Sequence, residues 1–235
     1  MTANIHFKLR PLHQRAHIDL NLSTYLLLVK RNWKEIWPDK TFRRLILATP
    51  FYIIAIASFF PWFFDFIEAR NGKILGDIIL DFLPAINVSG LIFFCLYTCL
   101  VISMTYLVAH PRQLLLTLLT YCMVTTLRIF SITLFPLHPP AGYIPLQEPV
   151  AQFFTNGTKI ISKDLFFSGH VATIMSLFYP IQNKIVRRIA LFLSIMVSVL
   201  VLVQHAHYTI DVLMAAFATY VSYLLAQRIA LKIKP

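Results

Sequence analysis

Apolar residues fill long stretches of the chain, and polar residues are gathered in short groups between them. Six stretches have about the length that a helix needs to cross the hydrocarbon core of a bilayer. They run over residues 45–64, 86–109, 113–136, 167–183, 187–205 and 207–229. The pattern therefore predicts an all-α protein, a transmembrane helix bundle with six spans.

A more polar segment with a different pattern precedes these stretches. Residues 20–37 mix apolar and basic positions at helical spacing, Trp33 and Trp37 lie near the end of the segment, and Pro38 follows it. An amphipathic helix of this kind lies along a membrane interface, where tryptophan is enriched. We therefore expect a cytoplasmic and interfacial N-terminal segment over residues 1–44 and a six-span catalytic membrane domain over residues 45–235.

The composition agrees with this pattern and narrows the class of protein. Of the 235 residues, 58% are hydrophobic and only 13% are charged, which excludes a soluble globular domain. The formal net charge of +11 would suggest nucleic-acid binding in a soluble protein. Excess Lys and Arg is also typical of the cytoplasmic loops of membrane proteins. We therefore expect no nucleic-acid partner.

The distribution of Lys and Arg predicts the orientation of the chain in the membrane. If the N-terminus is cytoplasmic, only Arg70, Lys73, Lys159 and Lys163 of the 21 basic residues fall in outer loops, and Arg128 falls within the third span. The remaining residues follow the positive-inside rule. We expect an integral multi-pass protein of the cell (inner) membrane, with both termini cytoplasmic.

Four ionisable residues from three spans are predicted to lie at a similar depth on the outer side. His170 stands at the outer start of the fourth span, and His207 and Asp211 stand at the outer start of the sixth. Arg128 comes eight residues before Pro136 in the third span, roughly 12 Å below the outer surface. Because charge within a membrane usually faces a cavity or a partner, we expect a site on the outer face.

The spacing of His207 and Asp211 suggests a chemical role. Four residues make about one helical turn, so the two side chains would share a helix face. A carboxylate beside an imidazole fixes its tautomer and stabilises its cation, which activates histidine as a nucleophile or a base. A polar pair that caps a helix is the alternative interpretation.

Together these residues suit phosphoryl transfer. Ser168 and Gly169 precede His170 at a predicted helix start, where free backbone N–H groups can face an anion. The planar fork of Arg128 is shaped to bind phosphate oxygens. One histidine can attack phosphorus while the other protonates the departing oxygen.

No group of residues has the spacing of a metal site. His205 and His207 are two residues apart and would point to different helix faces, so a zinc site is disfavoured. The three cysteines lie inside apolar stretches and form no metal-binding spacing. We expect neither a metal ion nor another cofactor.

Two sequence segments resemble a known family. DLFFSGHVAT and HAHYTIDV are similar to the two C-terminal motifs of sphingomyelin synthase-related proteins, within the wider phosphatidic acid phosphatase type 2 superfamily. LRIFSITLFPLHPP is similar to that branch's stretch at the end of the third span, so that the resemblance covers roughly residues 110–220. It implies a catalytic triad in which His207 becomes phosphorylated, Asp211 orients it, and His170 acts first as acid and then as base.

The chain also departs from the family patterns. Val171 stands where the synthases usually carry threonine, and Val201 where the phosphatase branch usually carries arginine. The lysine-to-Arg-Pro motif of the phosphatases is missing, since Tyr121 and Ile129 occupy the relevant places around Arg128. These departures favour the synthase-like branch and leave phosphate binding to Arg128 and to backbone donors.

The roles of two further polar residues stay open at this point. Asp164 matches an acidic position just upstream of the first motif in the synthases, and a cap at the start of the helix is the alternative. His205 is a possible neighbour of the site.

The resemblance implies a membrane lipid phosphotransferase. Such an enzyme moves a phosphocholine or phosphoethanolamine head group from a phospholipid donor to a lipid alcohol such as ceramide or diacylglycerol. A lipid phosphate phosphatase, with water as the acceptor, is the first alternative. A non-catalytic transporter or scaffold is the second, and Pro50 and Pro61 in the first span are the only hint of the broken helices of a transporter.

Overall fold

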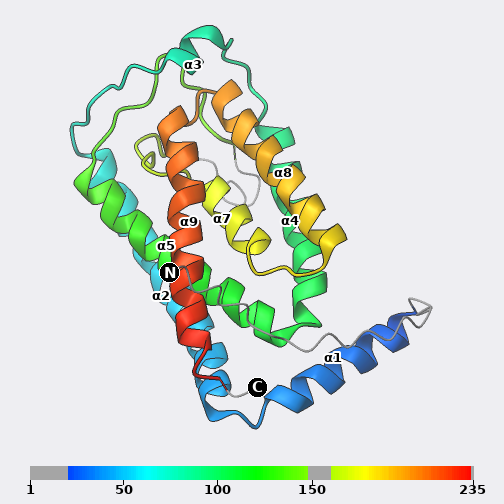
Figure 1. Cartoon of the computed structure of the whole chain (residues 1–235). Helices are drawn as coiled ribbons and strands as arrows, with labels where there is room; N and C mark the ends of the chain where they lie inside the picture. Colours follow the sequence, from blue (N-terminus) through cyan, green and yellow to red (C-terminus); the bar gives the residue numbers. More distant parts are fainter. Residues whose placement is uncertain (1–20, 148–159, 234–235) are drawn as a thin grey trace, which may run out of the picture.

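The computed structural model describes residues 21–147 and 160–233, and within them the chain forms helices and no strand. In chain order the helices are α1 (Leu22–Ile36), α2 (Lys40–Glu68), α3 (Ile78–Phe82), α4 (Ser89–Val108), α5 (Pro111–Leu134), α7 (Gly169–Phe178), α8 (Lys184–Val203) and α9 (Thr209–Ala230) (Figure 1). The prediction of an all-α fold is confirmed for the described residues.

Five of these helices, α2, α4, α5, α8 and α9, are long and apolar enough to cross a membrane. Local signals set where they begin. The carboxylate of Asp39 accepts a hydrogen bond from the amide of Phe42 at the start of α2, and the side chain of Asn183 accepts two at the start of α8. Pro111 occupies the first position of α5, where its missing N–H has no consequence. The fold is that of an integral membrane protein.

The predicted fourth span is a much shorter helix, so the count of six spans is not confirmed. Instead of residues 167–183, α7 contains 10 residues, which extend for roughly 15 Å, about half of the hydrocarbon core. It packs against α4, α5, α8 and α9 (Figure 1), and the side chains of Val171 and Ile174 are fully buried. Because protein rather than lipid surrounds α7, its length need not match the bilayer. Pro180 follows within two residues and cannot continue a helix.

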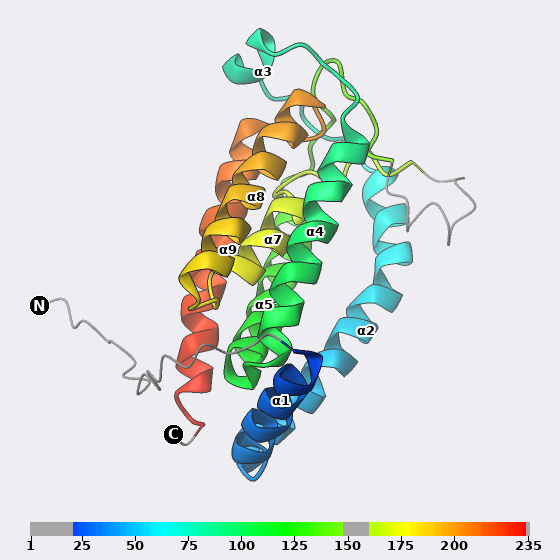
Figure 2. The ribbon, with the colours of Figure 1, turned by 90° about the vertical axis from the view of Figure 1, so that its right-hand side faces the viewer.

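Loops close the end of the bundle at which α5 ends and α7 and α9 begin (Figures 1 and 2). Lys73 lies in the loop after α2, and its amide donates to the carbonyl of Pro136 in the loop after α5. The carbonyl of Lys73 accepts from the amide of His138 in the same loop. The guanidinium of Arg70 donates to the carbonyls of Ile132 and Thr133, which lie in the last turn of α5 and have no partner within the helix. These bonds join the loop after α2 to the loop after α5.

Helix α1 lies at the other end of the bundle, beside the end of α4 (Figure 2). The indole of Trp33 donates to the carbonyl of Val108 at 2.8 Å, and the amide of Asn32 donates to that of Ala109 at 2.7 Å. A helix thus precedes the first candidate span, whereas its amphipathic character and its place at a membrane interface stay predictions. The first 20 residues of the predicted segment 1–44 lie outside the described residues.

Candidate functional site

An extended stretch, rather than a helix, leads into α7. The carbonyl of Phe167 accepts from Nε of Arg128 at 2.8 Å, and the carbonyl of Phe166 accepts from the hydroxyl of Ser131 at 2.9 Å. The amide of Ser168 donates to the backbone carbonyl of Asp211 at 3.2 Å. Because these groups bond to α5 and α9, they are not part of a helical ladder, and α7 begins only at Gly169.

A cavity of about 270 Å³ lies between α2, α4, α5 and α7. Its polar lining is concentrated at the start of α7 and on the facing part of α5, and its apolar lining comes mainly from α2 and α4. The lining residues are Phe60, Phe64, Phe93, Leu96, Tyr121, Val124, Thr125, Arg128, Asp164, Gly169, His170, Ala172 and Thr173. Arg128, Gly169 and His170, which the sequence predicts for one site, therefore meet at one cavity.

Arg128 lies across the start of α7. Its side chain is 11% exposed, and its Nη2 is 2.6 Å from Oδ1 of Asp164. A Cβ atom added at Gly169 would lie 2.9 Å from Cζ of Arg128, a distance that real contacts do not reach. Glycine at this position therefore leaves the space that the guanidinium occupies. With Nε on Phe167 and Nη2 on Asp164, the remaining edge of the guanidinium is left for a ligand.

Asp164 is the residue whose role the sequence left open. The structure pairs it with Arg128 and places it on the cavity wall. It does not cap α7, because the residue that precedes this helix is Ser168. The sequence signal was an acid six residues before His170, at a position that is also acidic in the synthases. Asp164 lies in the stretch before α7 and its partner Arg128 lies on α5, so spacing along the chain does not reveal the pair.

The two histidines predicted for catalysis are neighbours, and only one of them lines the cavity. The ring centroids of His170 and His207 are 6.4 Å apart. The ring of His170 also meets the edge of Phe93, with centroids 5.5 Å apart. His207 is only 3% exposed and is not among the residues of the cavity wall. His170 therefore lines the cavity, and His207 lies behind its wall, next to His170.

His207 and Asp211 are in contact, although not on one helix face as expected. Helix α9 begins at Thr209 rather than at residue 207, so His207 precedes it. Nδ1 of His207 is 3.4 Å from Oδ2 of Asp211, and the same oxygen accepts from the amide of Tyr208 at 3.0 Å. The carboxylate turns back toward the start of its helix, as in a capping box. It therefore caps α9 and faces the imidazole at the same time.

His205 faces the loops rather than the cavity. Its Nδ1 lies 2.7 Å from the carbonyl of Ala141, and its Nε2 lies 3.0 Å from the carbonyl of Leu83. Its φ of 51° places the backbone in the left-handed region, which turns the chain between α8 and α9. His205 thus joins both loops to the turn that carries His207.

Tyr208 and Thr209 add further bonds between this turn and the loops. The hydroxyl of Tyr208 donates to the carbonyl of His138 at 2.9 Å and accepts from the amide of Leu75 at 3.2 Å. The carboxylate of Asp77 accepts from the amide of Thr209 at 2.6 Å and from its hydroxyl at 2.9 Å. The position of His207 therefore depends on residues far away in the sequence.

Ser168 departs in one respect from its expected role as an anion-binding donor. Its amide is engaged with Asp211, and its hydroxyl is buried without a hydrogen-bond partner. The amides available to an anion are therefore those of Gly169 and the next residues, which have no acceptor within the helix. Among the described residues, no three His, Cys, Asp or Glu side chains are grouped so as to hold a metal ion.

The fold and the site define a helical integral membrane protein with a buried cluster of histidine, arginine and carboxylate groups. Residues 163–228 match the family model described as PAP2 superfamily C-terminal. This segment contains Asp164, His170, His207 and Asp211 but neither Arg128 nor α2. The match shows that this C-terminal part of the chain is similar to the PAP2 superfamily, and the similarity suggests an activity of the lipid phosphatase or phosphotransferase type. None of the curated proteins matches the chain.

Proposed function

We propose that this protein is a membrane lipid phosphotransferase that moves a phospho-head group from a phospholipid to a lipid alcohol. The head group is of the phosphocholine or phosphoethanolamine type, and the acceptor is an alcohol such as ceramide or diacylglycerol. The observation that carries the proposal is the meeting of Arg128, His170 and the start of α7 at one cavity, with the His207–Asp211 pair next to it.

In the first half-reaction, the phosphate lies between Arg128 and the first amides of α7, which bind its oxygens. Nε2 of His207 attacks phosphorus, because Nδ1 faces Asp211. An N–P bond forms while the P–O bond to the diacylglycerol oxygen breaks. Protonated His170 donates its proton to that oxygen, and the diacylglycerol leaves as a neutral alcohol. The carboxylate of Asp211 stabilises the cationic phosphoimidazole.

In the second half-reaction, neutral His170 acts as a base. It accepts the proton of the acceptor's hydroxyl as that oxygen attacks phosphorus. The new P–O bond forms while the N–P bond breaks, and the electron pair returns to Nε2 of His207. Both histidines are then in their starting protonation states, so the enzyme completes a cycle without any other reactant.

The cavity wall favours a lipid alcohol over water as the acceptor. One side of the cavity is apolar, and contact with a lipid is more favourable there than contact with water. This side is formed by Phe60, Phe64, Phe93 and Leu96. The phosphatase-branch arginine is replaced by Val201, which agrees with this preference. Hydrolysis by water is the outcome that would instead make the protein a lipid phosphatase.

The test is a transfer assay with the purified full-length protein in lipid vesicles. The donors are phosphatidylcholine and phosphatidylethanolamine labelled in the phosphate, each with and without an acceptor. The acceptor is ceramide, or a diacylglycerol whose chains differ in length from those of the donor, so that transfer to it gives a distinguishable lipid. We expect label in a new lipid only when an acceptor is present. Label that appears only in water-soluble products would establish hydrolysis, and the absence of any labelled product would reject the proposal.

Two variants test the assigned roles of the histidines. With a donor that has a good leaving group, which needs little protonation, His170→Ala should still accumulate acid-labile, base-stable label on the protein. His207→Ala should accumulate none, because no leaving group replaces a missing nucleophile. Label that persists without His207 would show that another residue is the nucleophile.

A further inference from the structure

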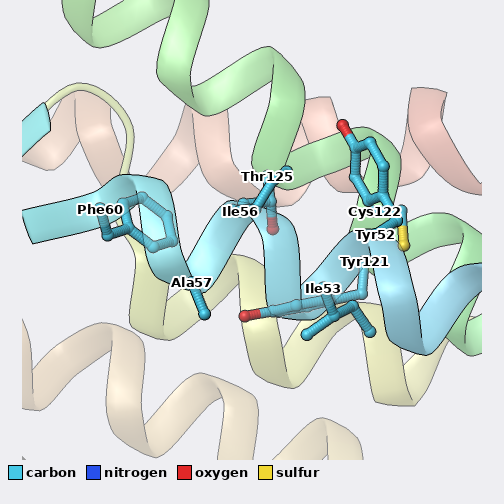
Figure 3. Close-up of a pocket in the computed structure, with 8 residues that line it drawn as sticks. All are labelled: Tyr52, Ile53, Ile56, Ala57, Phe60, Tyr121, Cys122 and Thr125. Carbon is cyan, nitrogen blue, oxygen red and sulfur yellow. The ribbon is translucent and has the colours of Figure 1, made fainter. Parts of the chain in front are cut away.

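A second, narrower pocket continues the active-site cavity along the surface between α2 and α5. Its volume is about 40 Å³, and Figure 3 shows side chains of both helices around it. Phe60, Tyr121 and Thr125 line both this pocket and the cavity, so the two spaces are adjacent. We use the name α2–α5 groove for this pocket, which extends to Tyr52 and Cys122.

The groove opens sideways from the bundle. On its α5 side Cys122 and Thr125 are buried, at 9% and 8% exposure, whereas Ala57 and Tyr52 on α2 are exposed. Helix α2 packs mainly against α5 and stands apart from α4 and α8 (Figure 2). Because both helices are candidate spans, the exposed side of the groove faces the lipid rather than the loops.

The cavity and the groove together have the length of one lipid chain. From Phe64 at the cavity to Tyr52 at the far end is 12 residues of α2, roughly 18 Å along the helix. One leaflet of the hydrocarbon core is about 15 Å thick. At the far end, the hydroxyls of Tyr52 and Thr126 form a hydrogen bond that joins α2 to α5.

We propose that the α2–α5 groove binds one hydrocarbon chain of the lipid whose phosphate lies at Arg128 and His170. The inference rests on the proposed phosphotransferase function and adds a site for the chain of its substrate. Four features of the site suit a lipid chain that enters from the bilayer. The cavity at one end is polar, the groove has apolar walls and opens sideways, and the length of the two together matches one chain. A water-soluble phosphate ester has no chain to place there.

Two alanines of α2 provide a matched test. Ala57 lines the groove and is its smallest side chain, while Ala55 is also exposed and does not line it. Ala57→Phe should fill the groove and lower kcat/KM for a long-chain donor about tenfold, the effect of about 1.4 kcal/mol. It should change kcat/KM for a short-chain donor with the same head group by less than twofold. Ala55→Phe should change neither value.

A photo-crosslinking experiment separates this inference from the proposed function. A long-chain phospholipid with a photoreactive group in the middle of one chain is incubated with the His207→Ala protein. This variant lacks the proposed nucleophile, so the experiment measures binding without turnover. We expect crosslinks to peptides that contain Tyr121 and Cys122, lost on adding Ala57→Phe and kept on adding Ala55→Phe. Crosslinks elsewhere, or equal effects of the two alanine substitutions, would overturn the groove assignment. A missing transfer activity with the expected crosslinks would reject only the catalytic proposal.

The closed end of the groove gives a second expectation. Tyr52→Ala removes the side chain that bridges to Thr126 and should shift the preferred donor toward longer chains. The measurement is competition between two donors that share a head group and differ in chain length. An unchanged product ratio would show that the chain does not reach Tyr52.

Discussion

Helices α2 and α7 line the same cavity from different sides, and their surroundings are opposite. Helix α2 has 29 residues, packs mainly against α5, and exposes apolar side chains such as Phe51 and Trp62. Helix α7 has 10 residues and is enclosed by four other helices. The difference shows that lipid and protein set different limits on helix length. A helix in contact with lipid must satisfy its backbone across the bilayer, whereas an enclosed helix can end where polar groups of its neighbours satisfy it.

The chemical character of the cavity follows from the same difference. Arg128, Asp164 and His170 lie on the side of the cavity that the bundle encloses, and an ion pair within a membrane needs such shelter from lipid. Phe60 and Phe64 come from α2, the helix that faces the bilayer. The cavity therefore has a reactive wall within the bundle and an apolar wall toward the membrane.

Among the substitutions that compare these two walls, Arg128→Lys in the reactive wall is expected to have the largest effect, a loss of activity. Lysine keeps the charge but has a single nitrogen in place of the planar fork whose Nε and Nη2 face Phe167 and Asp164, so it loses the geometry that also presents donors to a phosphate. We expect normal folding and a loss of kcat/KM of about a hundredfold to a thousandfold, as for other lost donors to a transition-state anion. Transfer kinetics and thermal unfolding measure the two properties. Full activity would reject the phosphate-binding role, and a failure to fold would show that the ion pair is mainly structural.

A pair of isoleucines compares the two helices directly. Ile174 of α7 is fully buried, and Ile54 of α2 is 62% exposed. Ile174→Ala should leave a cavity and lower the free energy of unfolding by about 2 kcal/mol, the low end of the usual range, because unfolding in a membrane exposes the side chain to lipid. Ile54→Ala should change it by less than about 0.5 kcal/mol. Equal effects, measured by unfolding in mixed micelles, would contradict the distinction between enclosed and lipid-facing helices.

A smaller effect on stability is expected from Asp77, whose carboxylate bonds to Thr209 in the turn that carries His207. Burial raises the pKa of its carboxyl, but hydrogen bonds from Thr209, Leu80 and Ile79 outweigh this effect and lower the pKa below the usual 3.8. A lowered folded-state pKa means that its stabilisation is complete above 3.8 and is lost as pH falls through the lower folded value.

We therefore expect Asp77→Asn to lower the free energy of unfolding by about 1 kcal/mol at neutral pH and to remove part of its acid dependence. Asp81→Asn is the control, since Asp81 is an exposed acid of α3, the short helix that follows Asp77. Unfolding curves between neutral and strongly acidic pH measure both effects. If the two variants have the same acid dependence, the bonds of Asp77 do not stabilise the turn.

The sequence by itself determined where helices form and which polar residues are candidates for the site. Long apolar runs predict helices because only a hydrogen-bonded backbone is stable in lipid. Local signals at Asp39, Pro111 and Asn183 mark three helix starts within a few residues of the predicted ones. Charge that is rare in an apolar chain singled out Arg128, His170, His207 and Asp211, and the structure brings these four together.

Only the tertiary structure decided the length of α7, the partner of Asp164 and the direction of His205. Each depends on groups that are distant in the sequence. Arg128 donates to the carbonyl of Phe167 in the stretch before α7, and the ring nitrogens of His205 lie within hydrogen-bond distance of the carbonyls of Leu83 and Ala141. A hydropathy pattern records how apolar a segment is, but not whether lipid or protein surrounds it. That surrounding decides how long a helix must be and which buried charges can pair, since both follow from contacts between helices rather than along one.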